Sequence, residues 1–355
     1  MTRRTLVFTA PRQVALRDAP VPEPGEGQVL VAAHLSAISA GTEMLIYRGQ
    51  APADLPADMT IPALSGSLAF PLTYGYSSVG EVVGLGKGVQ DGWLGRRAFA
   101  FHPHESHFTS RPEELTLLPD PLPDDDAAFI PTLETAVGLV HDGRPLAGER
   151  VVVIGQGIVG LLTTSLLARF PLESLITFDR FPLRRRASLD SGASLSLDPA
   201  AGIPSDLSPT PGADLVFELS GSPEGLDLAI ALTGFSGRIV IGSWYGTKPA
   251  SLDLGGRFHR SRIRLIASQV STIDPTLSGR WTKQRRLGFA LNLLADLRPS
   301  RFITQRFPLV EADRAYRLLD ECPETAIQVV LDYPVRSSPA GGRVRARKAS
   351  TGARP

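Results

Sequence analysis

A glycine-rich turn between two apolar runs carries the clearest chemical signal in this sequence. Val151–Ile154 has the length and β-branched content of a buried strand. Gly155-Gln156-Gly157-Ile158-Val159-Gly160 follows at once, and an apolar run of helical length continues to Phe170. A second short apolar run ends at Asp179, 19 residues after Gly160. This order of strand, glycine turn, helix, strand and acid predicts a dinucleotide-binding βαβ unit.

Each glycine of the turn has a separate predicted task. Gly155 permits the tight turn, Gly157 lets backbone N–H groups approach a pyrophosphate, and Gly160 allows close packing of the helix. The intervening residues Gln156, Ile158 and Val159 complete the predicted binding loop, whose helix N-terminus favours the phosphate charge.

The residues around Asp179 determine which nicotinamide cofactor is expected. A carboxylate accepts hydrogen bonds from a free ribose 2′-hydroxyl and repels a 2′-phosphate, which favours NAD. Arg180 and the run Arg184-Arg185-Arg186 favour NADP, because guanidinium groups bind phosphate well. The fingerprint spacing and close-range repulsion lead us to predict NAD, with Arg180 and Arg184 as cofactor contacts and NADP as the alternative.

Two further predicted strand ends carry polar or aromatic residues. Ser220 and Gly221 follow the strand that ends at Glu218, and Ser243 and Trp244 follow the next strand. Ligands bind at the carboxyl ends of strands in open α/β sheets, so these four residues are predicted cofactor contacts. Ordinary core packing is an equal alternative for Trp244 and its neighbour Tyr245.

The segment His102-Pro103-His104-Glu105-Ser106-His107 offers a possible metal site. In an extended strand His102 and His104 would share a face. A bend at Pro103 would break this alternation, and no third ligand is assured. We therefore favour histidines of a surface or pocket that bind no metal.

Composition limits the class of protein. The chain has 355 residues, a formal net charge of +1 and 43% hydrophobic residues, which suits a globular protein of two domains. Residues from Pro334 onward carry six basic groups and no acid, so the rest of the chain has a net charge of −5. That balance argues against nucleic acid as a partner, and the basic tail is expected to be disordered rather than bound to an anionic surface.

Cysteine content and hydropathy limit the expected disulfides, structural metal sites and cellular location. The single cysteine, Cys322, excludes an internal disulfide framework and a structural zinc site built on cysteines. The N-terminus lacks a signal-peptide pattern and no run approaches a membrane span, so we predict a cytoplasmic protein with no membrane partner.

The order of predicted elements indicates the fold class. The first 120 residues are strand-rich, and β and α segments alternate afterwards, as in an α/β protein preceded by a separate β domain. The expected divisions are 1–125, 126–300, 301–333 and a tail at 334–355, in which the third segment returns to the first domain. Expected helices are 126–141, 183–191, 224–232, 279–297 and 310–319, and expected strands include 4–9, 13–18, 28–36, 77–85, 97–102, 113–118, 214–218, 238–241, 261–268, 302–307 and 327–331.

Several stretches together resemble the medium-chain dehydrogenase/reductase superfamily over roughly residues 4–333. They are Ala40–Glu43 with Tyr47-Arg48-Gly49, Pro71–Gly86, the Thr135-Ala136 helix, the GQGIVG turn and Gly212–Gly225. The resemblance implies a GroES-like β-barrel domain, a doubly wound Rossmann sheet, a small-molecule substrate and a homodimer formed through the Rossmann sheet edge. The stretches GTEMLIYRG, WYGTKP and SQVSTI are similar to the bacteriochlorophyllide hydroxyethyl dehydrogenase-like subfamily, which does not identify a substrate.

The chain departs from that family where its zinc-binding members hold the metal. Ala40 stands at a cysteine, Tyr76 and Ser77 replace a His-Glu pair, and Glu134 is the one possible ligand near the third position. Zinc needs three or four convergent N, S or O ligands, so no zinc is expected.

Without zinc, a side chain must stabilise or protonate the reacting oxygen. The resemblance places Tyr76, His102 and Thr42 at the substrate pocket, and we predict them as the donors; packing, a pocket wall and a helix cap are the respective alternatives. Thr135 is predicted to contact the nicotinamide or to cap its helix.

The sequence thus predicts a zinc-independent NAD(P)-dependent oxidoreductase acting on an alcohol, a carbonyl or an activated double bond. A non-catalytic redox sensor and a quinone-reductase-like enzyme are the alternatives.

Overall fold

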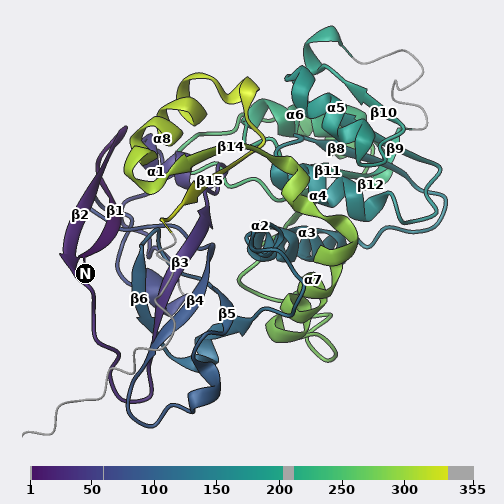
Figure 1. Cartoon of the computed structure of the whole chain (residues 1–355). Coiled ribbons are helices and arrows are strands. Elements are labelled where there is room, and N and C mark those ends of the chain that lie inside the picture. The colour runs from purple at the N-terminus through teal and green to yellow at the C-terminus, as the bar shows by residue number, and fades with distance from the viewer. Residues whose placement is uncertain (1, 59, 203–211, 335–355) are drawn as a thin grey trace, which may run out of the picture.

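The computed structural model describes residues 2–58, 60–202 and 212–334. They form two large sheets and a hairpin, with a layer of helices between the sheets (Figure 1). The predicted basic tail lies outside the described residues, apart from Pro334.

The N-terminal sheet has seven strands. Its path runs β14-β15-β3-β4-β5-β7, and β6 pairs with β3. The pairs are antiparallel except for β14 with β15. These strands are β3 (Val29–Ala37), β4 (Ser78–Leu85), β5 (Arg97–Ala100), β6 (His107–Ser110), β7 (Leu115–Leu117), β14 (Ile303–Pro308) and β15 (Gln328–Asp332), while β1 (Thr2–Ala10) and β2 (Gln13–Pro20) form the hairpin. The end of the described chain therefore completes the sheet that the first hundred residues begin.

The second sheet has six parallel strands in the order β10-β9-β8-β11-β12-β13. This is the doubly wound arrangement predicted from the alternating segments, with the glycine turn at the carboxyl end of a central strand. The strands are β8 (Arg150–Ile154), β9 (Ser174–Phe178), β10 (Leu195–Leu197), β11 (Ala213–Glu218), β12 (Thr233–Ile241) and β13 (Arg264–Ala267).

Helices connect the strands (Figure 1). They are α1 (Glu43–Tyr47), α2 (Asp124–Ala127), α3 (Ile130–Gly143), α4 (Ile158–Leu167), α5 (Pro182–Asp190), α6 (Pro223–Leu232), α7 (Lys283–Leu297) and α8 (Ala312–Glu321). Of these, α3, α4, α5 and α6 pack against the second sheet, whereas α1 and α8 lie beside the N-terminal strands (Figure 1). None of the described helices is long and apolar enough to cross a bilayer.

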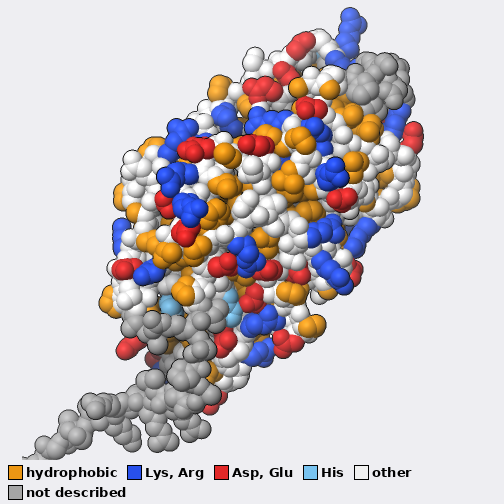
Figure 2. All heavy atoms as spheres, turned by 45° about the horizontal axis from the view of Figure 1, so that its top comes forward, with side chains coloured by type: hydrophobic (Ala, Val, Ile, Leu, Met, Phe, Trp, Pro, Cys, Tyr) orange, Lys and Arg blue, Asp and Glu red, His pale blue; other side chains and the backbone are white. Residues whose placement is uncertain are grey.

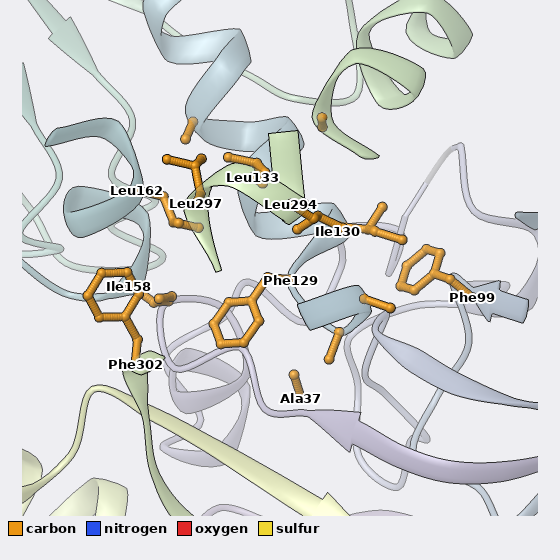
Figure 3. Packing of buried hydrophobic residues seen from close by; sticks show 14 of the residues in the cluster. Ala37, Phe99, Phe129, Ile130, Leu133, Ile158, Leu162, Leu294, Leu297 and Phe302 are labelled. Atoms are coloured by element: carbon orange, nitrogen blue, oxygen red, sulfur yellow. The ribbon is translucent and has the colours of Figure 1, made fainter. Parts of the chain in front are cut away.

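The largest apolar cluster among the described residues joins the first sheet to the layer of helices. Phe129, Ile130 and Leu133 at the start of α3 are fully buried, and they pack with Phe99 of β5 and Leu294 of α7 (Figure 3). Burial of side chains of this size stabilises each by about 1.5–3 kcal/mol. Because strands of the first sheet and helices α3, α4 and α7 share one core, the helix layer is fixed against the first sheet.

Several expected boundaries are wrong. The strand predicted to reach His102 ends at Ala100, so His102 and His104 do not alternate along a strand. The helix predicted from Gly279 begins at Lys283, because Thr282 caps it through the backbone N–H of Arg285 at 3.1 Å. The helix predicted as continuous over 126–141 divides into α2 and α3, and β6 and β10 were not predicted.

Charges of both signs are mixed over the molecular surface. On the face in Figure 2, the described Lys and Arg side chains lie among Asp and Glu side chains, with no extended area of one sign. This face lacks the continuous basic surface that nucleic-acid binding requires.

Candidate active site

A cleft of about 1840 Å³ lies between the two sheets. It is lined by the glycine turn, the strand ends of the second sheet, the turn before α1 and the 55–68 loop. Most of the predicted site residues line this one cleft: Thr42, Tyr76, His102, Thr135, Gly155, Gly157, Ile158, Val159, Gly160, Asp179, Arg180, Arg184, Ser220, Gly221, Ser243 and Trp244. The predicted cofactor contacts and the predicted donors therefore face a common space.

The three glycines of the turn differ in what surrounds them. Gly155 has φ +89°, and a Cβ there would meet the backbone of Leu219 and Ser220 at 2.6 Å. A Cβ on Gly160 would overlap the carbonyl oxygen of Gly155, so the close approach is to the turn itself. A Cβ on Gly157 would meet no protein atom within 4 Å. The open space needed for a pyrophosphate lies above Gly157, at the N-terminus of α4.

Asp179 fastens the turn to the neighbouring strand. Its Oδ2 accepts the backbone N–H of Gln156 at 2.7 Å, and its Oδ1 accepts that of Phe181 at 2.8 Å. The carboxylate is nearly buried but lines the cleft, and each oxygen retains a second lone pair. Asp179 can thus accept a ribose hydroxyl while holding the loop. Gln156 is fully buried, with its side chain bonded to Gly155 and Thr164 and its backbone N–H held by Asp179.

The two arginines predicted as cofactor contacts, Arg180 and Arg184, differ in whether their guanidinium groups are already hydrogen-bonded. Arg184 donates to the carbonyl oxygens of Pro323 and Ala326 at 3.0–3.2 Å, so it tethers α5 to the segment before β15. Arg180 is exposed, and its guanidinium lies over the ring of Phe181 with 4.7 Å to the centroid. Of the two, Arg180 has the uncommitted guanidinium.

The ends of β11 and β12 form a connected group. Glu218 is fully buried and accepts from Ser220, through both N–H and hydroxyl, and from the Tyr245 hydroxyl at 2.5 Å. Ser243 accepts the N–H of Gly221 at 2.8 Å. Trp244 lines the cleft, whereas Tyr245 is turned to Glu218.

Glu134 and Thr135 lie inside α3 and therefore do not cap the helix. Thr135 lies inside α3, where its hydroxyl donates to the carbonyl of Pro131 at 2.9 Å while facing the cleft. Glu134 accepts from Arg286 at 3.0 and 3.1 Å, and both side chains are about 97% buried. The carboxylate of Glu134 is therefore committed to an internal ion pair.

Tyr76 is the centre of a hydroxyl cluster. Its hydroxyl donates a short hydrogen bond to Ser39, and the Thr42 side chain also bonds to it. Burial raises the pKa of Tyr76 above its ordinary value, although these two hydrogen bonds act in the other direction. Thr42 occupies the N-cap position of α1 but makes no side-chain cap bond, so its predicted alternative role as a cap is wrong.

His102 is placed as an acceptor rather than a donor. Its Nδ1 lies 3.2 Å from the carbonyl oxygen of Pro103, so the proton sits on Nδ1, and its Nε2 lies 3.9 Å from the carboxylate of Glu105. The ring stacks on Phe108 with centroids 3.8 Å apart, and burial lowers the pKa of His102 to about 4. A neutral imidazole of this tautomer accepts a proton at Nε2.

The predicted zinc-ligand positions do not assemble a metal site. Ala40 has no donor atom, Tyr76 is bonded to Ser39, and Glu134 is paired with Arg286. Among residues 2–58, 60–202 and 212–334, no group of three His, Cys, Asp or Glu side chains is arranged to hold a metal ion. These three positions therefore supply no convergent ligand set for zinc.

Two residues that the sequence did not single out take part in the site. Ser39 was not predicted because a serine in a turn has no distinctive pattern. Glu43 was noted only as part of the turn, yet it is fully buried and accepts the N–H of Ser39 at 2.8 Å. A carboxylate inside an otherwise apolar helix, MLIY, is the sequence signal that could have identified it.

Curated relatives share sequence over most of the chain. The uncharacterized zinc-type alcohol dehydrogenase-like protein YphC of Escherichia coli K12 is 25% identical over 364 residues, covering 90% of this chain and 96% of the relative. L-threonine 3-dehydrogenase of E. coli K12 is 25% identical over 67% of this chain and 75% of its own length. (R,R)-butanediol dehydrogenase of Bacillus subtilis is 28% identical over 57% of this chain and 66% of its own length. No protein-family model matches the chain.

Solved structures share the fold. A Bacillus subtilis 2R,3R-butanediol dehydrogenase aligns with TM-score 0.74 and 19% identity over 93% of this chain and 99% of its own. An E. coli CFT073 alcohol dehydrogenase complexed with NADH and a Sinorhizobium meliloti 1021 protein bound to NADP each align with TM-score 0.73, at 18% and 21% identity. They cover 93% and 94% of this chain and 99% of each neighbour.

Proposed function

We propose that this chain is a zinc-independent, NAD(P)-dependent oxidoreductase of the medium-chain dehydrogenase/reductase superfamily that acts on a small molecule. The reaction is hydride transfer between nicotinamide and an alcohol or carbonyl carbon, or an activated double bond. One observation carries the proposal: the glycine turn and the hydroxyl cluster around Tyr76 line the same cleft.

The residues present fit a dinucleotide. Backbone N–H groups at Gly157 and the N-terminus of α4 would hold the pyrophosphate, because no side chain fills that space. Asp179 would accept the adenosine ribose hydroxyls. When bound, the nicotinamide supplies or accepts the hydride.

Tyr76 is the group proposed to move the proton. Because its pKa is raised, the phenol is neutral at neutral pH and can donate to an oxygen that gains negative charge. Ser39 and Thr42 hold the hydroxyl and can accept or pass on its proton. A neutral phenol is a proton donor, the role that reduction of a carbonyl requires. His102, neutral and with an unprotonated Nε2 3.9 Å from the carboxylate of Glu105, is proposed as a proton acceptor in the same cleft.

Zinc independence separates this proposal from the zinc-type names of the relatives. It is supported by the donor set at the three family positions, where Ala40 offers no ligand and Glu134 is paired with Arg286. With no convergent ligand set, the reacting oxygen must be stabilised by hydrogen bonds, and the Tyr76 cluster provides them.

NAD is the proposed cofactor in preference to NADP. Asp179 lies in the cleft, and Arg184 is tied to backbone carbonyls and so does not offer a free phosphate contact. Arg180 is the group that could accommodate a 2′-phosphate, which makes NADP the alternative.

A homodimer through the edge strand β13 is proposed on the family resemblance alone, with sedimentation as its test.

The experiment is a fluorescence titration of the chain with NADH and NADPH, followed by a screen of alcohols, aldehydes and quinones. Absorbance at the nicotinamide band reports turnover, and elemental analysis of the same sample reports zinc. Binding of NADH with turnover of a carbonyl, in the absence of bound zinc, is expected. Binding without turnover of any member of the panel would favour a redox sensor, and failure to bind either cofactor would contradict the proposal.

A further inference from the structure

A line of buried polar side chains runs behind Tyr76 through the N-terminal sheet. At its centre is Glu43, which has no exposed surface. Its Oε2 accepts from His104 Nε2 at 2.9 Å and from the Tyr316 hydroxyl, and its Oε1 accepts the backbone N–H of Ser39 at 2.8 Å. His104 and Tyr316 are equally buried, so the three donors surround one carboxylate that water does not reach.

One assignment of donors and acceptors gives every member of this line a partner. A carboxylate only accepts, so His104 carries a proton on Nε2. With a neutral ring, its Nδ1 accepts from the Ser36 hydroxyl at 2.6 Å, and Ser36 accepts from the Tyr333 hydroxyl at 2.9 Å. Each polar side chain of the line then has a hydrogen-bond partner. A fully satisfied buried network is rigid, whereas an unpaired member would be costly.

Two separate contacts connect this network to Tyr76. The first passes through Ser39, whose N–H is held by Glu43 and whose hydroxyl accepts from Tyr76. The second passes through His104, which packs against Gly75, the residue before Tyr76. A Cβ on Gly75 would lie 2.7 Å from the His104 ring, and the N–H of His104 donates to the carbonyl of Tyr74 at 3.2 Å. The network therefore holds both the acceptor of the Tyr76 hydroxyl and the backbone that carries the ring.

We propose that Glu43, anchored by His104 and Tyr316, is the positioning residue that fixes Tyr76 for proton donation. This inference rests on the proposed function, because it specifies how the donor of that reaction is held. A donor fixed before the reaction needs no reorganisation when charge develops on the substrate oxygen. The buried charge of Glu43 also opposes ionisation of Tyr76, as does Asp58, so the phenol keeps its proton.

The test follows the ionisation of position 76 directly. A difluorotyrosine incorporated at position 76 brings the phenol titration into the range where the chain is stable, and its ¹⁹F resonance is followed against pH. Glu43→Gln removes the negative charge and should move the half-titration point down by at least half a pH unit. Ser39→Ala removes a hydrogen-bond partner of the hydroxyl and should move it up. Opposite shifts from two residues on the same line are not expected from general loosening of the fold.

A matched variant, Glu149→Gln, removes a nearly buried carboxylate that pairs with Arg238 at 2.7 Å, next to β8 of the other sheet. It should leave the ¹⁹F titration unchanged. An unchanged titration in both Glu43→Gln and Ser39→Ala, or an equal shift in Glu149→Gln, would overturn the proposal. If Glu43→Gln does not fold, Tyr316→Phe keeps the ring and removes one donor from Glu43; an unmoved ¹⁹F resonance in that variant contradicts the inference. NADH titration of the unsubstituted chain is independent of these shifts, so a failure of the proposed function is seen separately.

Discussion

The side-chain oxygen Oδ2 of Asp179 lies 2.7 Å from the backbone nitrogen of Gln156. The residue that would select the cofactor thus also ties β9 to the glycine turn. A substitution at Asp179 has two physical consequences, loss of a ribose acceptor and loosening of the loop, and they can be separated by comparing the two cofactors.

Replacement of Asp179 by Ser is expected to change cofactor preference. The removal of a charged acceptor should weaken NADH binding by about 1.5–3 kcal/mol. NADPH binding should weaken less or improve, because repulsion of its 2′-phosphate is lost while Arg180 remains. Fluorescence titration with both cofactors measures the ratio of dissociation constants. Asp190→Ser, an exposed aspartate at the end of α5, is the control and should leave the ratio unchanged. An unaltered ratio in Asp179→Ser would refute the assignment.

Gly160→Ala should lower the stability of the fold, whereas Gly157→Ala should weaken NADH binding. The Cβ of Gly160→Ala would overlap the carbonyl oxygen of Gly155, so the melting temperature should fall by several degrees. The Cβ of Gly157→Ala meets no protein atom, and φ of −64° suits alanine, so stability should be unchanged or slightly higher. NADH affinity should nevertheless drop in Gly157→Ala, because the methyl group occupies the space above the helix N-terminus. Calorimetry and NADH titration on both variants test this, and tight NADH binding by a stable Gly157→Ala would be the contrary result.

Removal of the Tyr76 hydroxyl should reduce turnover without affecting cofactor binding. Tyr76→Phe retains the edge-on contact with Tyr74, whose ring centroid lies 6.3 Å away. General acid catalysis contributes about 10²–10⁴-fold, and a loss of kcat in that range is expected. Tyr47→Phe is a matched control, since the Tyr47 hydroxyl has no hydrogen bond among the described residues. Equal kcat values for the Tyr76→Phe variant and the unsubstituted chain would exclude Tyr76 as the proton donor.

The burial of His102 makes stability depend on pH. Because the folded pKa, about 4, lies below the ordinary 6.5, the unfolded chain binds the proton first. The stabilisation is therefore complete above pH 6.5 and is lost as the pH falls from 6.5 towards 4. The change is at most about 3.4 kcal/mol at 1.36 kcal/mol per pKa unit. Urea unfolding at several pH values should show a shallower acid dependence in His102→Gln than in the unsubstituted chain. The exposed His259→Gln should retain the original slope, and parallel curves for all three proteins would contradict the prediction.

Features that depend on neighbouring residues could be predicted from the sequence, whereas contacts between residues far apart in the chain could not. The glycine turn, the parallel strands around it and Asp179 could be predicted, because strand length, glycine spacing and the following acid lie within thirty residues of one another. The pairing of Glu43 with His104 and Tyr316 could not, because those contacts join residues 61 and 273 positions apart. The strand expected over 97–102 was too long, because β5 ends at Ala100, before Pro103. Short polar strands such as β6 carry too little apolar alternation to be recognised.

Removal of metal should leave the activity intact. In the cleft, Ala40 offers no ligand, the Tyr76 hydroxyl is bonded to Ser39, and Glu134 is held by a buried arginine. Three convergent donors are the minimum for a tightly held zinc ion, so the purified chain is expected to contain well under one zinc per chain. Dialysis against a chelator should then change kcat by less than twofold, and added zinc should not raise it. Arg286→Met is a second test, because it frees the carboxylate of Glu134. Leaving that buried charge unpaired should lower the stability by about 3–5 kcal/mol. The variant should still bind no zinc, because the other two positions remain without ligands. A stoichiometric zinc content that falls together with activity on dialysis would instead show that the metal is held by residues outside this set.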